Sequence, residues 1–433
     1  MKHVTPDWFK KSAVYQINPR TFCEEGTIKA VTKELPVLAE LGFKIMYLCP
    51  IFEEDASEDR SFWSDRQKKS ETENPKNPYR MNDYYKIDDE YGTMDDLREF
   101  VAEAHKLGLK VFLDLVYLHI GPNAPILKIH PEFTNLDEDG NIILGRWHFP
   151  LFNYESLGAR EYLWGNMVYY IGAIDVDGFR CDVGDEVPLD FWEEGVRRIK
   201  AIKPDAVMIN EGVKADYLTV FDANYGFPWH TSLHQILRKE IVAADVIAKY
   251  NEISGEYPVG GLVLRDMDNH DTATDWPYRI EKHFGHDCME LILAINYTID
   301  GVPMVYCGND IADTTRHSMF ANRFHRGVYE VADRNAKGEA VDRRKEIVKT
   351  LNSLKREVAV LSEGETEWTK TDSDYILAFD RISDTEKVTF IGNFSDECAE
   401  IEAPNGEILL SNNAEIKDGK IKLSKYGYAI IRR

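Results

Sequence analysis

Short apolar runs alternate with longer helix-like stretches through most of the chain, and no other feature of the sequence constrains the fold as strongly. The runs are Val14–Ile17, Ile45–Leu48, Val111–Val116, Val176–Phe179, Val207–Asn210, Thr219–Asp222, Leu262–Leu264 and Pro303–Tyr306. They are continuous rather than alternating, which is typical of strands buried on both faces in a parallel sheet covered by helices. About eight strand–helix alternations favour a (β/α)₈ TIM barrel, although the count alone leaves a doubly wound sheet open.

The stretches between these runs carry helix signals. Thr93 stands before Asp95 and Asp96 as a predicted N-cap followed by acids in the first turn, and Gly108 ends the apolar pattern that follows. His286–Ile299 and Val341–Leu354 show a similar pattern.

The pattern changes after residue 358, where short strand candidates are separated by turn signals such as Asp418–Gly419. We therefore predict a catalytic barrel over residues 1–358 and a C-terminal antiparallel β-sandwich domain over residues 359–433. Residues 119–156 follow the third strand and are expected to form a short inserted domain B. The polar stretch Glu53–Glu73 is expected to be a solvated excursion, with a lid or an interface as the alternative.

Acidic residues outnumber basic ones, 75 against 52, so the formal net charge is −23. Binding to nucleic acid or to an anionic membrane needs clustered positive charge, so we expect neither as a partner. The chain has no signal-peptide pattern and no apolar run approaching the roughly 20 residues that span a bilayer. Its six cysteines are scattered without a CxxC pair, and together these features predict a cytoplasmic protein.

Ionisable residues occupy the ends of four predicted strands, where an ordinary core excludes them. They are Asp114 and His119 after the third, Arg180 and Asp182 at the fourth, Glu211 at the fifth, and Asp268, His270 and Asp271 at the seventh. In a parallel barrel these ends meet at one rim, so three acids, Asp182, Glu211 and Asp271, are expected to converge on one cavity.

Converging carboxyls suggest cleavage of a glycosidic bond, in which one acid stays ionised and another donates a proton. Arg180 is expected to lower the pKa of Asp182, and the neighbouring acids are expected to raise the pKa of Glu211. Taken singly, the Arg–Asp pair also fits a structural ion pair, Glu211 fits the start of a loop, and His270–Asp271 fits a solvated turn.

At these residues the chain resembles the α-amylase family, glycoside hydrolase family 13. Its third-strand motif is similar to DLVYLH (Asp114–His119), its fourth to GFRCD (Gly178–Asp182) and its seventh to DNHD (Asp268–Asp271), and Glu211 falls where the family places its acid/base. The stretches YQINPRTF and NPYRMNDYY also resemble the family. Within the family the chain is loosely closest to the neopullulanase, cyclomaltodextrinase and maltogenic amylase branch, but without the N-terminal domain of that branch.

The resemblance implies a retaining α-glycoside hydrolase that acts on α-1,4-linked glucans or maltooligosaccharides. Alternatives are a transglycosylase or an α-1,6-acting member that uses the same acids, and a catalytically inactive carbohydrate-binding relative. The implied catalytic residues are Asp182 as nucleophile, Glu211 as acid/base and Asp271 as the acid that binds the sugar. The implied substrate-binding residues are Tyr79, Asp114, His119, Arg180 and His270.

Two departures from the family concern metals. Leu118 replaces the Asn that helps to bind calcium in many α-amylases, and the PRTFCEEGT loop after the first strand lacks the family's DxDxD calcium loop. We therefore expect no metal and no other cofactor, although calcium remains possible. Arg80 stands where the family usually has Asp.

Overall fold

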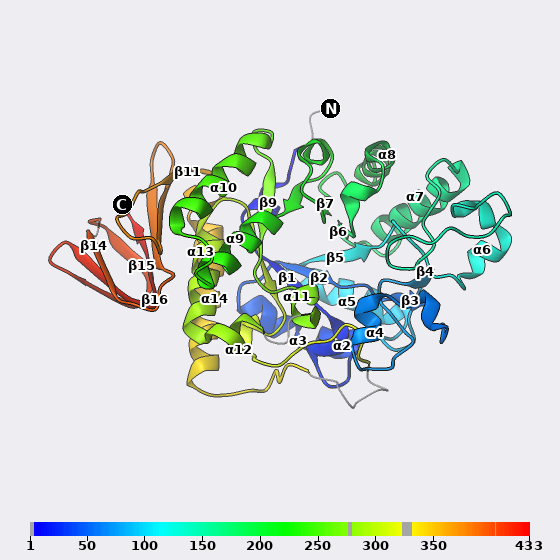
Figure 1. Cartoon of the computed structure of the whole chain (residues 1–433), viewed down its shortest axis with the longest axis horizontal. Coiled ribbons are helices and arrows are strands. Elements are labelled where there is room, and N and C mark those ends of the chain that lie inside the picture. The colour runs from blue at the N-terminus through cyan, green and yellow to red at the C-terminus, as the bar shows by residue number, and fades with distance from the viewer. Residues whose placement is uncertain (1–3, 276–278, 323–330, 403) are drawn as a thin grey trace.

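The computed structural model describes residues 4–275, 279–322, 331–402 and 404–433 (Figure 1). Eight parallel strands close into a barrel in the order β1-β10-β9-β8-β7-β6-β5-β2, which excludes the doubly wound alternative. They are β1 (Val14–Ile17), β2 (Ile45–Leu48), β5 (Lys110–Leu115), β6 (Gly178–Cys181), β7 (Val207–Asn210), β8 (Ala223–Tyr225), β9 (Leu262–Arg265) and β10 (Val302–Tyr306).

Helices cover the outside of the barrel, so that the strands are buried on both faces. The longer ones are α3 (Ile28–Glu40), α5 (Met94–Lys106), α7 (Leu157–Gly172), α8 (Leu189–Lys200), α9 (Phe227–Leu237), α10 (Ala243–Glu256), α13 (His286–Thr298) and α14 (Glu339–Glu357). The shorter ones are α1 (Asp7–Lys10), α2 (Pro19–Phe22), α4 (Asp65–Lys69), α6 (Pro125–Ile129), α11 (His270–Asp275), α12 (Ile280–Phe284) and α15 (Val360–Glu363).

The predicted start of α5 is confirmed in detail. The Thr93 hydroxyl accepts a hydrogen bond from the Asp96 amide, and the Asp96 carboxylate accepts one from the Thr93 amide, which makes a capping box. Gly108 follows the helix with φ +69°, a conformation that favours glycine.

The sixth barrel strand differs from the prediction. Thr219–Asp222 do not form it, because Ala215–Thr219 make a 3₁₀ turn and the strand β8 begins at Ala223. The Asp222 carboxylate accepts the amide hydrogen of Met208 at 2.8 Å, so this side chain is bonded to the backbone of β7 just before β8 begins. Val220 and Phe221 are buried, and their apolar character therefore reflects packing outside the strand.

The C-terminal residues form an antiparallel sheet in the order β11-β12-β13-β16-β14, with β15 paired to β16. The strands are β11 (Glu365–Trp368), β12 (Ile376–Ile382), β13 (Lys387–Asn393), β14 (Ala399–Glu402), β15 (Glu407–Lys417) and β16 (Lys420–Arg432). Strands β13 and β16 contact α13 on one side of the barrel, and the sheet lies at the left end of the molecule in Figure 1.

Two connections build the mouth of the barrel at the carboxyl ends of its strands. Between β2 and β5 the chain forms an antiparallel pair, β3 (Phe52–Glu54) and β4 (Met81–Ile87), with α4 between them. The expected solvated excursion holds only for part of this stretch: residues 58–61 are exposed, whereas Glu54, Asp55, Trp63 and Gln67 are buried. Residues 119–156 contain α6 and short isolated bridges such as the one between His119 and Leu151.

Across the described residues, none of the helices combines the length and apolar character needed to cross a bilayer.

Candidate active site

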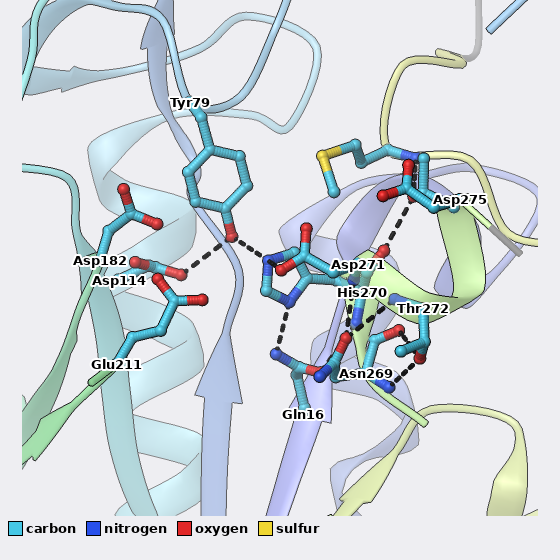
Figure 2. A network of polar contacts seen from close by, with 12 residues as sticks. Gln16, Tyr79, Asp114, Asp182, Glu211, Asn269, His270, Asp271, Thr272 and Asp275 are labelled. Atoms are coloured by element: carbon cyan, nitrogen blue, oxygen red, sulfur yellow. Dashed lines mark hydrogen bonds and ion pairs between the residues drawn. The ribbon is translucent and has the colours of Figure 1, made fainter. Parts of the chain in front are cut away.

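The carboxyl ends of the barrel strands surround a cavity of about 380 Å³. This volume is within the range of small-molecule sites. Of the eight predicted site residues, six line the cavity: Tyr79, His119, Asp182, Glu211, His270 and Asp271. The other two, Asp114 and Arg180, are buried in contact with them. The structure therefore brings all eight together, and Figure 2 shows the acids facing Tyr79 and His270.

One buried guanidinium holds three of the acids. Arg180 Nη1 donates to Asp114 Oδ1 at 2.8 Å and to Asp182 Oδ1 at 2.9 Å, and Arg180 Nη2 lies 2.6 Å from Glu211 Oε1. Arg180 and Asp182 point to the same side because they are two residues apart at the end of β6. The group carries one positive charge against three carboxyls.

Burial dominates the acidity of the Asp182–Glu211 pair. It raises the pKa of Asp182 well above its usual value, and the opposing effect of Arg180 is smaller. Arg180 therefore acts in the expected direction, but burial outweighs it, and the net pKa of Asp182 is raised rather than lowered. The pKa of Glu211 is also raised, by burial first and then by the charge of Asp271, as expected in direction.

Asp114 is an anchor for Arg180 rather than a wall of the cavity. Its Oδ2 accepts hydrogen bonds from the hydroxyls of Tyr47 at 2.5 Å and Tyr79 at 3.2 Å, in addition to the contact with Arg180. Tyr47 was not predicted as a site residue, because it comes from the middle of β2 and carries no motif of its own.

The ring of His270 is oriented by two partners. Gln16 Oε1 accepts the His270 amide hydrogen at 3.2 Å, so Gln16 Nε2 faces and donates to His270 Nδ1 at 2.9 Å. The other ring nitrogen, Nε2, lies 2.6 Å from the Tyr79 hydroxyl. Burial lowers the pKa of His270, so the ring is neutral and its proton is on Nε2. The only sequence signal for Gln16 is its place in the YQINPRTF stretch.

His119 lies on the opposite side, against aromatic rings. Its Nε2 is 3.9 Å from Asp182 Oδ2, and its ring packs edge-on against Trp147 and Phe149. Burial lowers the pKa of His119 to about 3, which makes it a neutral hydrogen-bonding group at neutral pH.

Asp271 differs from the other two acids because its pKa is lowered rather than raised. Its Oδ1 is 2.8 Å from Arg66 Nη1, and its Oδ2 is 3.6 Å from His270 Nε2. Burial opposes the charge, but the positive charges of Arg66 and Arg180 hold the pKa of Asp271 below its usual value. Arg66 was not predicted as a site residue.

Leu118 stands where the family has one of its calcium ligands. Leu118 packs its side chain against the hydrophobic core and offers no oxygen. Within the described part of the chain, no group of three or more His, Cys, Asp or Glu side chains is arranged to hold a metal ion.

Known proteins resemble this chain in sequence and in fold. Residues 3–131 match the family model described as the α-amylase catalytic domain. The chain is 26% identical over 367 residues to a maltogenic α-amylase of Bacillus acidopullulyticus, covering 71% of this chain and 57% of that relative. It is 24% identical over 454 residues to a cyclomaltodextrinase of Geobacillus thermopakistaniensis, covering 92% of this chain and 71% of that one. The fold matches the crystal structure of an α-amylase from Lactobacillus plantarum with a TM-score of 0.81 and 20% identity, over 98% of this chain and 99% of the other.

Proposed function

We propose that this chain is a member of the α-amylase family and a retaining α-glycoside hydrolase that cleaves α-1,4-linked glucans or maltooligosaccharides. One observation carries the proposal. A single guanidinium contacts both Asp182 and Glu211, and Asp271 lines the same cavity. A pair of adjacent carboxyls is the minimum that retaining glycoside cleavage requires.

In the first step the Asp182 carboxylate attacks the anomeric carbon, and Glu211 gives its proton to the leaving glycosidic oxygen. The new bond joins Asp182 to the sugar, and the glycosidic electron pair leaves with the oxygen. Because burial makes two negative charges side by side costly, the pair retains one proton, which this mechanism places on Glu211.

In the second step Glu211 takes a proton from water, and the resulting hydroxide attacks the anomeric carbon. The bond to Asp182 breaks, so the product regains the configuration of the substrate. The roles of Glu211 as acid and then as base follow from its place beside the scissile oxygen in both steps.

The remaining groups bind the sugar at the point of cleavage. Asp271, held as the anion, accepts hydrogen bonds from sugar hydroxyls and stabilises the positive charge that develops on the ring. His119 and His270 are neutral, so they bind hydroxyls without opposing that charge. The ring of Tyr79 supplies an apolar face for the pyranose.

The test is a product analysis with maltose through maltoheptaose, cyclodextrins, pullulan and isomaltose. Glucose and maltose formed with retained α configuration, seen by proton NMR in the first minutes, support the proposal. Elongated oligosaccharides would instead favour a transglycosylase, and turnover of isomaltose alone would favour the α-1,6-acting alternative. Absence of any turnover, or an inverted first product, would contradict the proposal.

We also propose that the activity needs no metal ion. We further propose that the protein is cytoplasmic. The side chain of Leu118 supports the first point, since it offers no oxygen where the family's calcium ligand stands. The second is supported by the six cysteines, all of which are free thiols in the fold, four of them buried.

A further inference from the structure

The segment of residues 55–80, here called the rim segment, is folded against the barrel mouth. Gln67 Nε2 donates to the carbonyls of Asn74 at 2.9 Å and Pro75 at 3.2 Å, which closes the segment on itself. Asn74 Nδ2 donates to the Phe320 carbonyl at 2.9 Å, which ties the segment to the loop after β10. The rim segment is therefore a built wall of the cavity.

Arg80 is the internal anchor of the rim segment. Its side chain is fully buried, and its guanidinium donates to the carbonyls of Phe62 at 2.7 Å, Asp55 at 3.0 Å and Pro75 at 2.6 Å. These carbonyls come from both ends and the middle of the segment. Arg80 thus holds the shape of the wall from a buried position behind the cavity.

The short helix α4 presents one cation to the acids. Ser64 caps the helix by accepting the Gln67 amide hydrogen at 3.2 Å. From this helix Arg66 Nη1 reaches Asp271 Oδ1 at 2.8 Å, and Arg66 Nε reaches Asp275 Oδ1 at 2.7 Å. Asp271 and Asp275 are four residues apart on α11, so one guanidinium spans one face of that helix.

We propose that Arg66 is a positioning residue that holds Asp271 in the orientation required for turnover. This inference rests on the proposed function. Oδ1 lies 2.8 Å from Arg66 Nη1 and Oδ2 lies 3.6 Å from His270 Nε2, and the contact with the guanidinium restricts the rotation of the carboxylate at the cavity that Asp271 lines. A carboxylate that is fixed before the sugar arrives needs no reorganisation as charge develops on the ring.

A purely structural ion pair makes a different prediction. Exposed ion pairs contribute little to stability, and the Arg66 side chain is 35% exposed. Because Arg80 and Gln67 already hold the rim segment, loss of the Arg66 guanidinium is expected to leave the wall in place. Loss of the Arg66 guanidinium should then lower turnover, and the size of this loss should depend on the presence of the Asp271 carboxylate.

The experiment is a double-mutant cycle with 4-nitrophenyl α-maltotrioside. Arg66→Ala is made in the wild type and in Asp271→Asn, and Lys68→Ala serves as the matched control, because it removes a positive charge from the same helix without contact to Asp271. We expect Arg66→Ala to lower kcat about 10- to 100-fold with KM changed less than about threefold. Lys68→Ala is expected to match the wild type, and Arg66→Ala is expected to cost less than about twofold in the Asp271→Asn background.

Arg66→Lys and Asp275→Asn keep the test decisive if Arg66→Ala does not fold. Lysine keeps the charge but is a single point donor, so we expect it to retain part of the activity. Asp275→Asn weakens the second contact of the guanidinium and is expected to lower kcat by a smaller factor than Arg66→Ala.

The inference is overturned if the folded Arg66 variants match Lys68→Ala, or if the losses from Arg66→Ala and Asp271→Asn multiply. An inactive wild-type enzyme would count against the proposed function itself. An active wild type with unchanged Arg66 variants would count only against the role of Arg66.

Discussion

Two neighbouring acids of the cavity are expected to change the stability of the fold in opposite directions when each is replaced by asparagine. Asp182 has a raised pKa because of burial, so it binds its proton more tightly in the folded than in the unfolded chain. Its ionisation therefore destabilises the fold at pH values above the unfolded pKa of about 3.9. Asp271 has a lowered pKa, so its charge stabilises the fold above that pH.

The magnitudes follow from the charges in contact. Asp182→Asn removes one of three carboxyls around Arg180, while the amide oxygen still accepts the hydrogen bond from Nη1. Relieving a destabilised active-site residue typically stabilises a protein by about 0.5–2 kcal/mol, and we expect a gain of about 1 kcal/mol at pH 7. Asp271→Asn loses the ion pair with Arg66, and because both side chains are about one-third exposed we expect a loss of about 0.5–1 kcal/mol.

The assay is urea unfolding followed by tryptophan fluorescence at pH 7 and pH 5. The gain for Asp182→Asn is expected to shrink at pH 5, because burial raises the pKa of Asp182 and a lower pH favours the protonated form that the fold prefers. The loss for Asp271→Asn is expected to be equal at both pH values, because its folded and unfolded pKa values both lie below 5. Asp95→Asn, at a side chain that is 90% exposed, is the control and is expected to change stability by less than about 0.5 kcal/mol. A stability change of the same sign in both cavity variants would refute the reasoning.

Three further predictions concern activity. Asp182→Asn and Glu211→Gln are each expected to lower kcat by several orders of magnitude with an unchanged circular dichroism spectrum, and near-native turnover in either would contradict their roles. Tyr79→Phe removes the hydroxyl between His270 and Asp114 and is expected to lower kcat about tenfold. Tyr117→Phe is the control: it loses a buried hydroxyl bonded to Asn166 at 2.7 Å and is expected to lower stability but not turnover. Dialysis against EDTA is expected to leave turnover unchanged, whereas activity restored only by added calcium would contradict the absence of a metal requirement.

Local sequence was sufficient where the physical cause is local. Continuous apolar runs predict strands buried on both faces, and most of the barrel strands lie where those runs occur. The cap at Thr93 involves Asp96, only three residues away, and it was predicted because its cause lies in neighbouring residues of the sequence. The sixth strand was misplaced because Val220 and Phe221 are buried outside the sheet, and burial alone does not distinguish a strand from a packed turn.

Strand-end acids were predictable together because all strands of a parallel barrel end at one rim. Asp182, Glu211 and Asp271 needed only that topology to meet. Their partners were not predictable in this way. Gln16 and His270 are 254 positions apart, and Tyr47 and Asp114 are 67 apart, with no motif that links them.

Strand patterning, the geometry of parallel strands and the resemblance of the strand-end motifs to the α-amylase family were therefore enough to predict the barrel, the three acids and their shared cavity. The electrostatics of the cavity became known from the folded structure alone. Whether an acid is raised or lowered in pKa depends on how deeply it is buried and on how many carboxyls share one guanidinium, as at Arg180. It also depends on a cation brought from a distant segment, as Arg66 is brought to Asp271, and such long-range proximity is a property of the folded chain.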